Sequence, residues 1–319
     1  MRRALVTGGL GFIGSHLVDR LLRDGWEVVV LDNLLTGRRS NLEHQKGNPR
    51  LQIREGDIRH LQTVVSASVG CDAVFHLAAH ALMRVSLGDH RADLDHNVIG
   101  TLNVLESMSA NKISDLVFAS TSALYGEAEV VPTPEDYSGV QTSLYGAAKL
   151  AAEAYASAFV QLTPMKFWAF RFGTVLGERC RRGAIWDFEH KLLKNPSELE
   201  ILGDGKQSKD YLSVSDCIDG IMVGYEKSSE PVNIFNLGLQ EQTTVDDVAD
   251  IVIEEMGLSN VRKRYTGGVR GWIGDNPVVY LSIKRIQALG WKPKVSPAET
   301  IRSTARWTLE EIGGDRRAA

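Results

Sequence analysis

Three glycines near the start of the chain constrain its fold more than any other feature. Gly8, Gly11 and Gly14 lie in the segment Thr7–Gly14, which follows a short apolar run and precedes apolar residues at helical spacing. Glycine permits a tight turn from strand to helix, close approach of a ligand to the backbone, and close packing of the helix on the strand. The segment therefore predicts a strand, a phosphate-binding turn and a helix whose N-terminus faces the phosphates.

A second strand and an acidic residue follow at the distance that a dinucleotide site requires. The apolar run Val28–Leu31 ends in Asp32. A carboxylate at this place accepts hydrogen bonds from the hydroxyl groups of an adenosine ribose and repels a 2′-phosphate. The pattern therefore predicts NAD, in preference to NADP, as the cofactor.

Segments with strand-like and helix-like periodicity alternate through the first half of the chain. This alternation predicts an α/β fold with a Rossmann-type, doubly wound parallel sheet that helices cover on both faces. In such a sheet, ligands bind at the carboxyl ends of the strands. Five residues that follow strand runs are expected to meet at that edge: Thr7, Asp32, Asp57, Ala78 and Ser120.

Three polar residues of this half have competing interpretations. Asp57 could reach the adenine amino group or could cap the helix after it, and both roles can hold. Asn97, on a helix expected from about 93 to 108, could hold a water or a backbone group near the site. His76 lies inside an apolar run, which favours a hydrogen-bonded core histidine over a catalytic one.

A tyrosine and a lysine four residues apart provide the candidate chemistry. Tyr145 and Lys149 would lie one turn apart on one face of a helix, and Thr121 and Ser122 end the strand run before it. A nearby ammonium favours the phenolate, which predicts a pKa for Tyr145 below the usual value of about 10. The serine hydroxyl would bond the same substrate oxygen that the tyrosine deprotonates. This group suits removal of a proton from an alcohol while a hydride leaves its carbon.

The composition is that of an ordinary globular protein and disfavours several classes. The 319 residues carry a net charge of -4, which gives no general attraction to nucleic acid or to anionic membranes. No apolar run approaches the length of about 20 residues that spans a bilayer. The three cysteines are scattered without metal-ligand spacing, which favours a reducing compartment. We therefore expect a cytoplasmic protein without a metal.

Together these motifs are similar to those of the extended short-chain dehydrogenase/reductase superfamily, in particular its nucleotide-sugar epimerase branch. The likeness covers nearly the whole chain. Besides the glycine segment, it rests on residues 32–37, 56–58, 76–79, 120–126, 143–149, 203–205, 209–211, 270–272 and 274–275.

The resemblance implies an NAD-dependent 4-epimerisation of a UDP-hexose through a transient 4-keto intermediate, as in the UDP-glucose 4-epimerases. By this resemblance Tyr145 is the base, and Lys149 keeps the phenol acidic and holds the nicotinamide ribose. Ser122, with Thr121, would position the sugar O4. The phosphates would stay anchored while the keto sugar turns over and takes the hydride back on its other face.

The motifs also assign residues to the two ligands. The expected NAD-binding residues are Gly8, Gly11, Phe12, Ile13, Gly14, Asp32, Asn33, Thr36, Gly37, Asp57, Ile58, Leu77, Ala78, Ala79, Asn97, Ser120, Tyr145 and Lys149. The expected substrate-binding residues are Ser122, Thr174, Arg182, Lys209, Arg270 and Asp275. Thr174 stands where the family usually has Asn, and Lys209 stands where Arg is more usual. Arg270 is either a phosphate ligand or a member of a surface ion pair.

The residue after Ser122 helps to choose the reaction. Sugar 4,6-dehydratases and the related decarboxylases usually carry an acidic residue there, to handle a second proton. This chain has Ala123, whose methyl group cannot move a proton. The position therefore disfavours dehydration.

Other functions stay open. Arg179, Arg181 and Arg182 cluster in a loop that is either solvated or an anion site, and in the second case it would suit the carboxylate of UDP-glucuronate. A nucleotide-sugar dehydratase or reductase is another enzyme alternative. The alternative from another class is a non-catalytic NAD-binding regulator, although a regulator need not keep the serine, tyrosine and lysine.

The clean alternation fades after the strand that ends near residue 172. We expect residues 1–172 to form the NAD-binding Rossmann domain, rejoined by about 207–238, and residues 173–319 to form mainly a smaller α/β domain that binds the nucleotide sugar. The resemblance also implies a homodimer, in which the helix near 93–108 and the Tyr145 helix pack across a two-fold axis. Alanines on the Tyr145 helix would permit this packing, or close packing on its own sheet.

Overall fold

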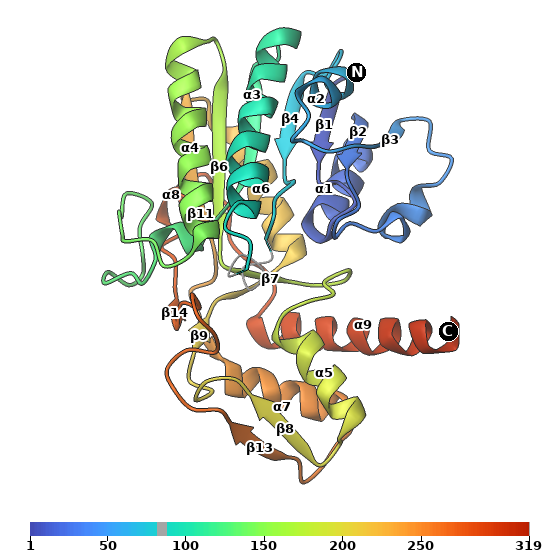
Figure 1. Ribbon diagram of the computed structural model, residues 1–319, viewed down its shortest axis with the longest axis vertical. Helices are drawn as coiled ribbons and strands as arrows, with labels where there is room; N and C mark the ends of the chain where they lie inside the picture. The colour runs from blue at the N-terminus through green and yellow to red at the C-terminus, as the bar shows by residue number, and fades with distance from the viewer. Residues whose placement is uncertain (82–87, 319) are drawn as a thin grey trace.

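The chain folds around a seven-stranded sheet in which every neighbouring pair of strands is parallel (Figure 1). The computed structural model describes residues 1–81 and 88–318. β-Branched runs such as Val28–Val30 suit a sheet that is buried on both faces. The strands lie in the order β3 (Leu51–Glu55), β2 (Glu27–Asp32), β1 (Arg3–Thr7), β4 (Ala73–His76), β5 (Asp115–Thr121), β6 (Lys166–Phe172) and β11 (Val232–Leu237). This order confirms the predicted Rossmann-type fold.

Helices cover both faces of the sheet, because successive side chains of each strand point to opposite sides. In β1, for example, Ala4 and Val6 pack in one core and Leu5 packs in the other. The first core contains α1 (Phe12–Arg23), α6 (Val214–Lys227) and the short α8 (Lys284–Ala288). The second core contains α2 (Leu61–Ala67), α3 (Gly100–Asn111) and α4 (Leu144–Leu162).

The helix expected from about 93 to 108 has an irregular first half. A π-helical turn, η3 (Leu94–Ile99), leads directly into α3. Such wide turns inside helices occur often at functional sites. Here the turn carries His96, which lines the cavity described below.

A smaller α/β part lies below the sheet in the view of Figure 1. It packs three helices against two short strands, α5 (Ala184–Lys194), α7 (Val245–Glu255) and α9 (Pro297–Ala318) with β8 (Glu198–Ile201) and β13 (Arg262–Tyr265). Short strands lie between the two parts: β7 (Thr174–Leu176) with β10 (Tyr211–Ser213), and β9 (Ser208–Lys209) with β12 (Thr243–Thr244) and β14 (Val278–Val279). Two 3₁₀ turns complete the described elements: η1 (Arg39–Gln45) and η4 (Ser122–Tyr125).

A buried carboxyl group in the smaller part makes the stability of the protein depend on pH. Glu189 on α5 is fully buried, and neither of its oxygens has a hydrogen-bond partner among the described residues. Burial raises the pKa of Glu189 to about 8. The native state therefore binds a proton that the unfolded chain releases near its ordinary pKa, so stability falls as the pH rises from about 4.5 through 8.

Glu189→Gln is expected to remove this pH dependence. At pH 8 the free energy of unfolding of the variant should exceed that of the parent by roughly 1–3 kcal/mol, because glutamine, unlike Glu189, does not ionise in the unfolded chain. At pH 4.5 the two proteins should be nearly equal, since the carboxyl group is then protonated in the folded state. Urea unfolding at both pH values measures the difference, with Glu310→Gln on the exposed side of α9 as the control. Equal stabilities of parent and Glu189→Gln at pH 8 would contradict the assignment.

Candidate active site

A cavity of about 620 Å³ opens beside the carboxyl ends of β1, β2, β4 and β5. It gathers residues that are far apart in the sequence. Its walls include most of the residues expected to bind the cofactor: Gly8, Gly11, Phe12, Ile13, Gly14, Asp32, Asn33, Thr36, Gly37, Ile58, Leu77, Ala78, Ala79, Ser120, Tyr145 and Lys149. The glycine turn, the acid after β2 and the Tyr-Lys pair therefore share one cavity.

The glycine turn presents an uncompensated helix N-terminus to this cavity. Gly11 is the N-cap of α1 and supplies no capping side chain, and the first turn of α1 holds no acidic residue. The N–H groups of the first turn therefore remain available to an anion. A Cβ on Gly14 would lie 2.1 Å from the carbonyl oxygen of Gly8, so only glycine lets the helix approach the turn this closely.

Asp32 is held at the end of β2 by the backbone. Its Oδ2 accepts a hydrogen bond from the Leu10 N–H (3.0 Å) and its Oδ1 accepts one from the Leu34 N–H (2.9 Å). Burial raises the pKa of Asp32, against the opposing effect of these two hydrogen bonds. A Cβ on Gly37 would lie 2.7 Å from Oδ1, which leaves room for a ribose beside the carboxylate. The turn and this carboxylate together fit NAD.

A buried histidine shapes the strand ends beside the turn. His76 Nδ1 lies 2.6 Å from the hydroxyl oxygen of Thr7, and His76 Nε2 lies 3.0 Å from that of Thr101. Thr7 also accepts a hydrogen bond from the Ala78 N–H at 3.2 Å, so Ala78 lies against the turn. Burial lowers the pKa of His76 to about 3. The interpretation of His76 as a core histidine is confirmed.

The start of α4 sets the position of the Tyr-Lys pair. The Ser143 hydroxyl caps the helix by accepting a hydrogen bond from the Gly146 N–H at 3.1 Å. A Cβ on Gly146 would lie 2.5 Å from the Ala123 carbonyl oxygen, so the first turn of α4 packs tightly on η4. This packing brings Tyr145 to Thr121, with which it forms a side-chain hydrogen bond. The phenol therefore has the Thr121 hydroxyl as a hydrogen-bond partner, and Ser122, the next residue, is also buried.

The pKa of Tyr145 differs from the sequence-based prediction. Burial raises it above its ordinary value, although the charge of Arg182 and the hydrogen bond from Thr121 oppose this, and the charge of Asp93 adds to it. Lys149 is itself buried, which lowers its pKa to about 7. Its ammonium lies 3.8 Å from the centroid of the Phe118 ring. The Tyr-Lys spacing predicts the shared face but not the desolvation of both groups.

Two residues expected to touch the cofactor have hydrogen-bond partners within the protein and do not line the cavity. Asp57 does not line the cavity; it accepts hydrogen bonds from Asn33 Nδ2 (2.9 Å) and from the backbone and side chain of Arg59. Burial alone would raise the pKa of Asp57, but these bonds outweigh it and hold the pKa well below its ordinary value. It is not the cap of α2, whose N-cap is His60.

Asn97 is the second such residue. Its side-chain amide bonds both backbone groups of His80, at 2.8 and 2.9 Å, and Asp93 at 3.2 Å. Asn97 is buried and does not line the cavity. It therefore holds a backbone group near the site, as one of its two interpretations proposed.

The expected substrate residues are less concentrated than the cofactor residues. Lys209 Nζ lies 2.7 Å from Asp275 Oδ1, so these two form an ion pair. Arg270 forms an exposed ion pair with Glu127. Thr174 begins β7. None of these four expected residues, nor Ser122, lines the cavity, whereas Arg182 does.

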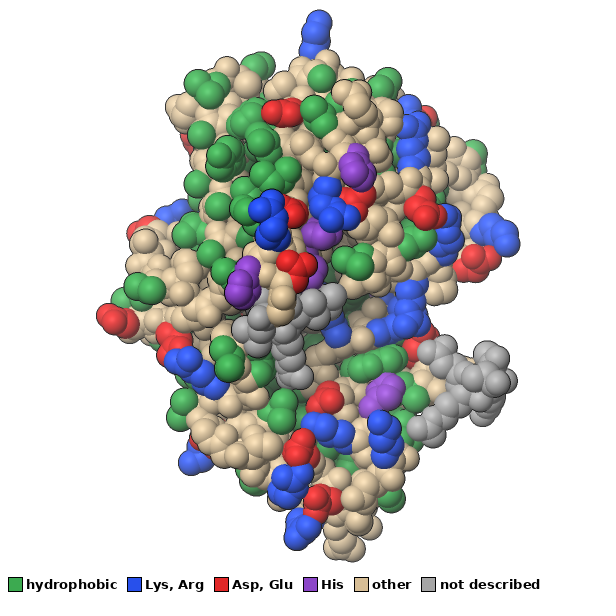
Figure 2. Space-filling view, in the orientation of Figure 1, with side chains coloured by type: hydrophobic (Ala, Val, Ile, Leu, Met, Phe, Trp, Pro, Cys, Tyr) green, Lys and Arg blue, Asp and Glu red, His purple; other side chains and the backbone are tan. Residues whose placement is uncertain are grey.

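Four arginines line the cavity, and the sequence assigned a ligand of its own to only one of them, Arg182. Arg38, Arg179, Arg181 and Arg182 all line it, and Figure 2 shows Lys and Arg side chains at the hollow between the two parts of the molecule. Arg181 donates to Glu311 (2.6 Å) and Asn41 (2.8 Å). Arg179 pairs with Asp19, and Arg38 lies 3.9 Å from Glu311.

Arg182 differs from the other arginines of the cavity. It donates to the Ala81 carbonyl oxygen at 3.4 Å and forms no ion pair with a residue that the structure describes. Its charge lowers the pKa of Tyr145. The loop predicted as either solvated or anion-binding thus supplies one cation beside the phenol.

Within the described residues, no helix is long and apolar enough to cross a membrane. The same residues contain no group of three or more histidine, cysteine or acidic side chains that could hold a metal ion.

Comparisons with known proteins agree with the geometry. Residues 4–238 match the model of the NAD dependent epimerase/dehydratase family. The putative UDP-glucose 4-epimerase of Methanocaldococcus jannaschii is 35% identical over 95% of this chain and 97% of its own length. The UDP-glucose 4-epimerase of Thermotoga maritima, solved with UDP-glucose, is 31% identical, with a TM-score of 0.88 over 97% of this chain and 99% of that one.

The same fold also serves a different reaction among the solved structures. The dTDP-glucose 4,6-dehydratase of Streptomyces venezuelae, solved with NAD, is 28% identical to this chain. Its TM-score is 0.90, over 98% of each chain. On the family match and the identity to its relatives, the chain belongs to the NAD dependent epimerase/dehydratase family.

Proposed function

We propose that the protein is an NAD-dependent 4-epimerase of a UDP-hexose. One observation carries the proposal: Tyr145 and Lys149 line a cavity that has four arginines and, among the described residues, one carboxylate, that of Asp32. The positive walls suit the diphosphate of a nucleotide sugar. Asp32 is fixed at the end of β2, with β1 and β4 between it and β5. No carboxylate of the described cavity wall is therefore left beside Tyr145 to move a second proton, which dehydration requires.

The residues divide the work of a reversible oxidation at C4. Tyr145 takes the proton from the sugar O4 through its phenol oxygen and later returns it, and Thr121 holds that phenol by a hydrogen bond. NAD, when bound, supplies the acceptor for the hydrogen that leaves C4. Lys149 holds the nicotinamide ribose, and Ser122 and Thr121 position O4. The arginines anchor the diphosphate while the sugar turns.

A second substrate class is favoured by Arg182. Its guanidinium stands near Tyr145 without a carboxylate partner among the described residues, which suits the carboxylate of a UDP-uronate. On this alternative the chemistry at Tyr145 is unchanged.

Arg182→Ala separates the two substrate classes. If Arg182 meets a uronate carboxylate, the variant should lose about 100-fold in kcat/KM for UDP-glucuronate and keep most of its activity on UDP-glucose. If Arg182 only lowers the pKa of Tyr145, activity on both sugars should fall by the same factor. Proton NMR of the purified protein with UDP-glucose, UDP-N-acetylglucosamine and UDP-glucuronate, each alone, follows the 4-epimers. Arg182→Lys is the matched control, because lysine keeps the positive charge but cannot donate the two parallel hydrogen bonds by which a guanidinium binds a carboxylate. A parent enzyme that converts none of the three sugars would contradict the proposed function.

The proposal includes a homodimer. Leu94 and Ile99 on η3, and Leu144, Leu150 and Leu162 on α4, are all exposed, and Figure 2 shows hydrophobic side chains gathered over this side of the molecule. Ala152 and Ala156 pack in the core on the sheet of their own chain, so the leucines rather than these alanines would meet a second copy. Sedimentation velocity that gives a monomeric mass at micromolar concentration would contradict the dimer.

We also place the enzyme in the cytoplasm. Cys71, Cys180 and Cys217 are all buried free thiols, which is usual in a reducing compartment. Fractionation that recovers the protein outside the cytoplasm would contradict this placement.

A further inference from the structure

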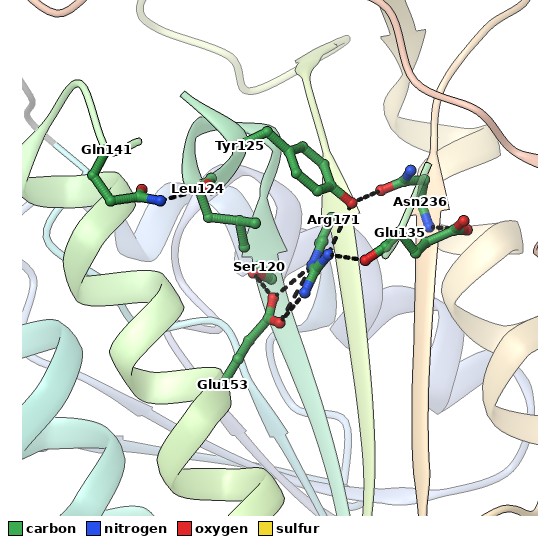
Figure 3. Close-up of polar contacts among 8 residues, drawn as sticks. All are labelled: Ser120, Leu124, Tyr125, Glu135, Gln141, Glu153, Arg171 and Asn236. Atoms are coloured by element: carbon green, nitrogen blue, oxygen red, sulfur yellow. Dashed lines mark hydrogen bonds and ion pairs between the residues drawn. The ribbon is translucent and has the colours of Figure 1, made fainter. Parts of the chain in front are cut away.

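A buried chain of polar side chains joins α4 to strands β5, β6 and β11 (Figure 3). At its centre, Arg171 on β6 forms a hydrogen-bonded ion pair with Glu153 on α4. Arg171 Nη2 lies 2.6 Å from Glu153 Oε2, and Arg171 Nε lies 3.1 Å from Oε1. The Ser120 hydroxyl donates a further hydrogen bond to Oε1. The Glu153 carboxylate is thus fixed by two side chains from two strands.

The second terminal nitrogen of Arg171, Nη1, extends the hydrogen-bond network to residues that do not line the cavity. Arg171 Nη1 donates to the hydroxyl oxygen of Tyr125 (2.9 Å) and to the Glu135 carbonyl (2.8 Å). The Tyr125 hydroxyl donates to Asn236 on β11 at 2.7 Å, and the Asn236 N–H donates to the Glu135 carboxylate at 3.0 Å. This framework leaves Glu153 little freedom to move.

Glu153 lies one helical turn from Lys149 on the same face of α4. The exposed fractions of Lys149 and Glu153 are 2% and 3%. The Lys149 ammonium lies over the ring of Phe118, and both Lys149 and Ser120 line the cavity. A buried ammonium over an apolar ring is costly unless a counter-charge is near.

Glu153 is the group whose charge raises the pKa of Lys149, against the larger lowering effect of burial. His76, whose own pKa is lowered by burial and by Lys149, is neutral and supplies no counter-charge. Among the other charged or titratable groups of the described residues, Asp93 at the N-cap of η3 and Arg182 from the loop after β7 act on Tyr145. His96 from η3 lines the same cavity. Arg171 from β6 and Tyr125 from η4 belong to the hydrogen-bond network that holds Glu153. The Asp93 carboxylate already has a partner, because its Oδ1 lies 3.0 Å from His80 Nδ1.

We propose that Glu153 is a positioning residue of this site: its carboxylate, fixed by Arg171 and Ser120, keeps the Lys149 ammonium charged at the cavity. The inference rests on the proposed function, because it concerns the lysine that holds the nicotinamide ribose there. Arg171 and Ser120 act through Glu153 and orient it. Glu153 does not line the cavity, so its effect on the reaction passes through Lys149.

The test compares two ways of removing the carboxylate charge. Glu153→Gln alone leaves Arg171 buried without its partner and is expected to be less stable. The double variant Glu153→Gln with Arg171→Met removes both charges and is expected to fold, because neutral replacements of a buried ion pair are usually tolerated. Glu135→Gln, at the far end of the same framework, is the matched control. Each protein is studied as purified, with any NAD that it retains.

Two readouts distinguish positioning from simple stability. The first is the pKa of Lys149, followed by the ¹³Cε shift of labelled lysine and assigned with Lys149→Met. The second is the pH profile of kcat for epimerisation. In the double variant the Lys149 pKa and the alkaline limb of kcat should both move down by about one unit, since deprotonated Lys149 no longer supports the reaction. Glu135→Gln should leave both where they are in the parent.

Failure of the inference and failure of the proposed function would give different experimental results. The NMR titration requires no substrate, so an unmoved Lys149 resonance in the folded double variant would overturn the role of Glu153 by itself. A parent enzyme that turns over no UDP sugar would overturn the proposed function, whatever the lysine titration shows. A lowered kcat with an unmoved pH profile would make Glu153 merely structural and would also overturn the inference.

Discussion

Tyr145→Phe is expected to lower kcat about 1,000-fold, because the variant has no hydroxyl to take the proton from the sugar O4 and general-base groups contribute roughly 10²–10⁴ in rate. The remaining ring fills the same space, so folding and NAD content should not change. The measurement is turnover of UDP-glucose, with the NAD released by acid from each purified protein as the second readout.

Tyr155→Phe is the matched control for this variant. Tyr155 is on the same helix, and its side chain is half exposed. Its loss of a hydroxyl should leave both kcat and NAD content unchanged. Turnover by Tyr145→Phe within a factor of ten of the parent would show that another group removes the proton.

Gly14→Ala is expected to have the second large effect. The new Cβ would lie 2.1 Å from the carbonyl oxygen of Gly8. Gly8 cannot retreat, because its own Cα faces Ala78, whose N atom lies 2.6 Å from where a Gly8 Cβ would be. Helix α1 must therefore move off the turn, which takes its N-terminal N–H groups away from the phosphates. We expect at least a 100-fold loss of NAD affinity, and a loss of roughly 1–3 kcal/mol in unfolding free energy from the overpacking.

The control for this variant is Gly313→Ala on α9, where a Cβ has no described atom within 4 Å. There alanine should stabilise the helix slightly, by about 0.5–1 kcal/mol. NAD binding is measured by isothermal titration of protein stripped of cofactor. If Gly14→Ala bound NAD as tightly as the parent, the glycine turn would not be part of the cofactor site.

The parts of the site that could be predicted from the sequence depend on local pattern and on the rule for parallel sheets. The spacing of Gly8, Gly11 and Gly14 and the position of Asp32 after a strand suffice to place a turn and a carboxylate at one edge. The four-residue spacing of Tyr145 and Lys149 places both on one face of a helix. All of these residues line the same cavity.

The parts that sequence reasoning missed depend on tertiary contacts. Arg270 and Lys209 form ion pairs with Glu127 and Asp275, which are distant in sequence, so no local pattern could predict these pairs. The pKa of Tyr145 depends on burial, which no local pattern reports. Arg38 belongs to none of the sequence motifs, although it directly follows the motif at residues 32–37. The signal for Glu153 was an acidic residue four positions after Lys149, which became meaningful once both proved to be buried.

The measurement that tests the central claim most directly uses UDP-glucose labelled with deuterium at C4 and no added NAD. If the protein carries its own NAD and epimerises at C4, proton NMR should show the H1 signal of the 4-epimer, with deuterium retained at C4 in the product. Retention follows because the hydrogen removed from C4 returns to the same carbon and never becomes a proton in water. An epimer that has lost its deuterium to solvent, or no epimer of any of the three UDP sugars even after NAD is added, would contradict the account.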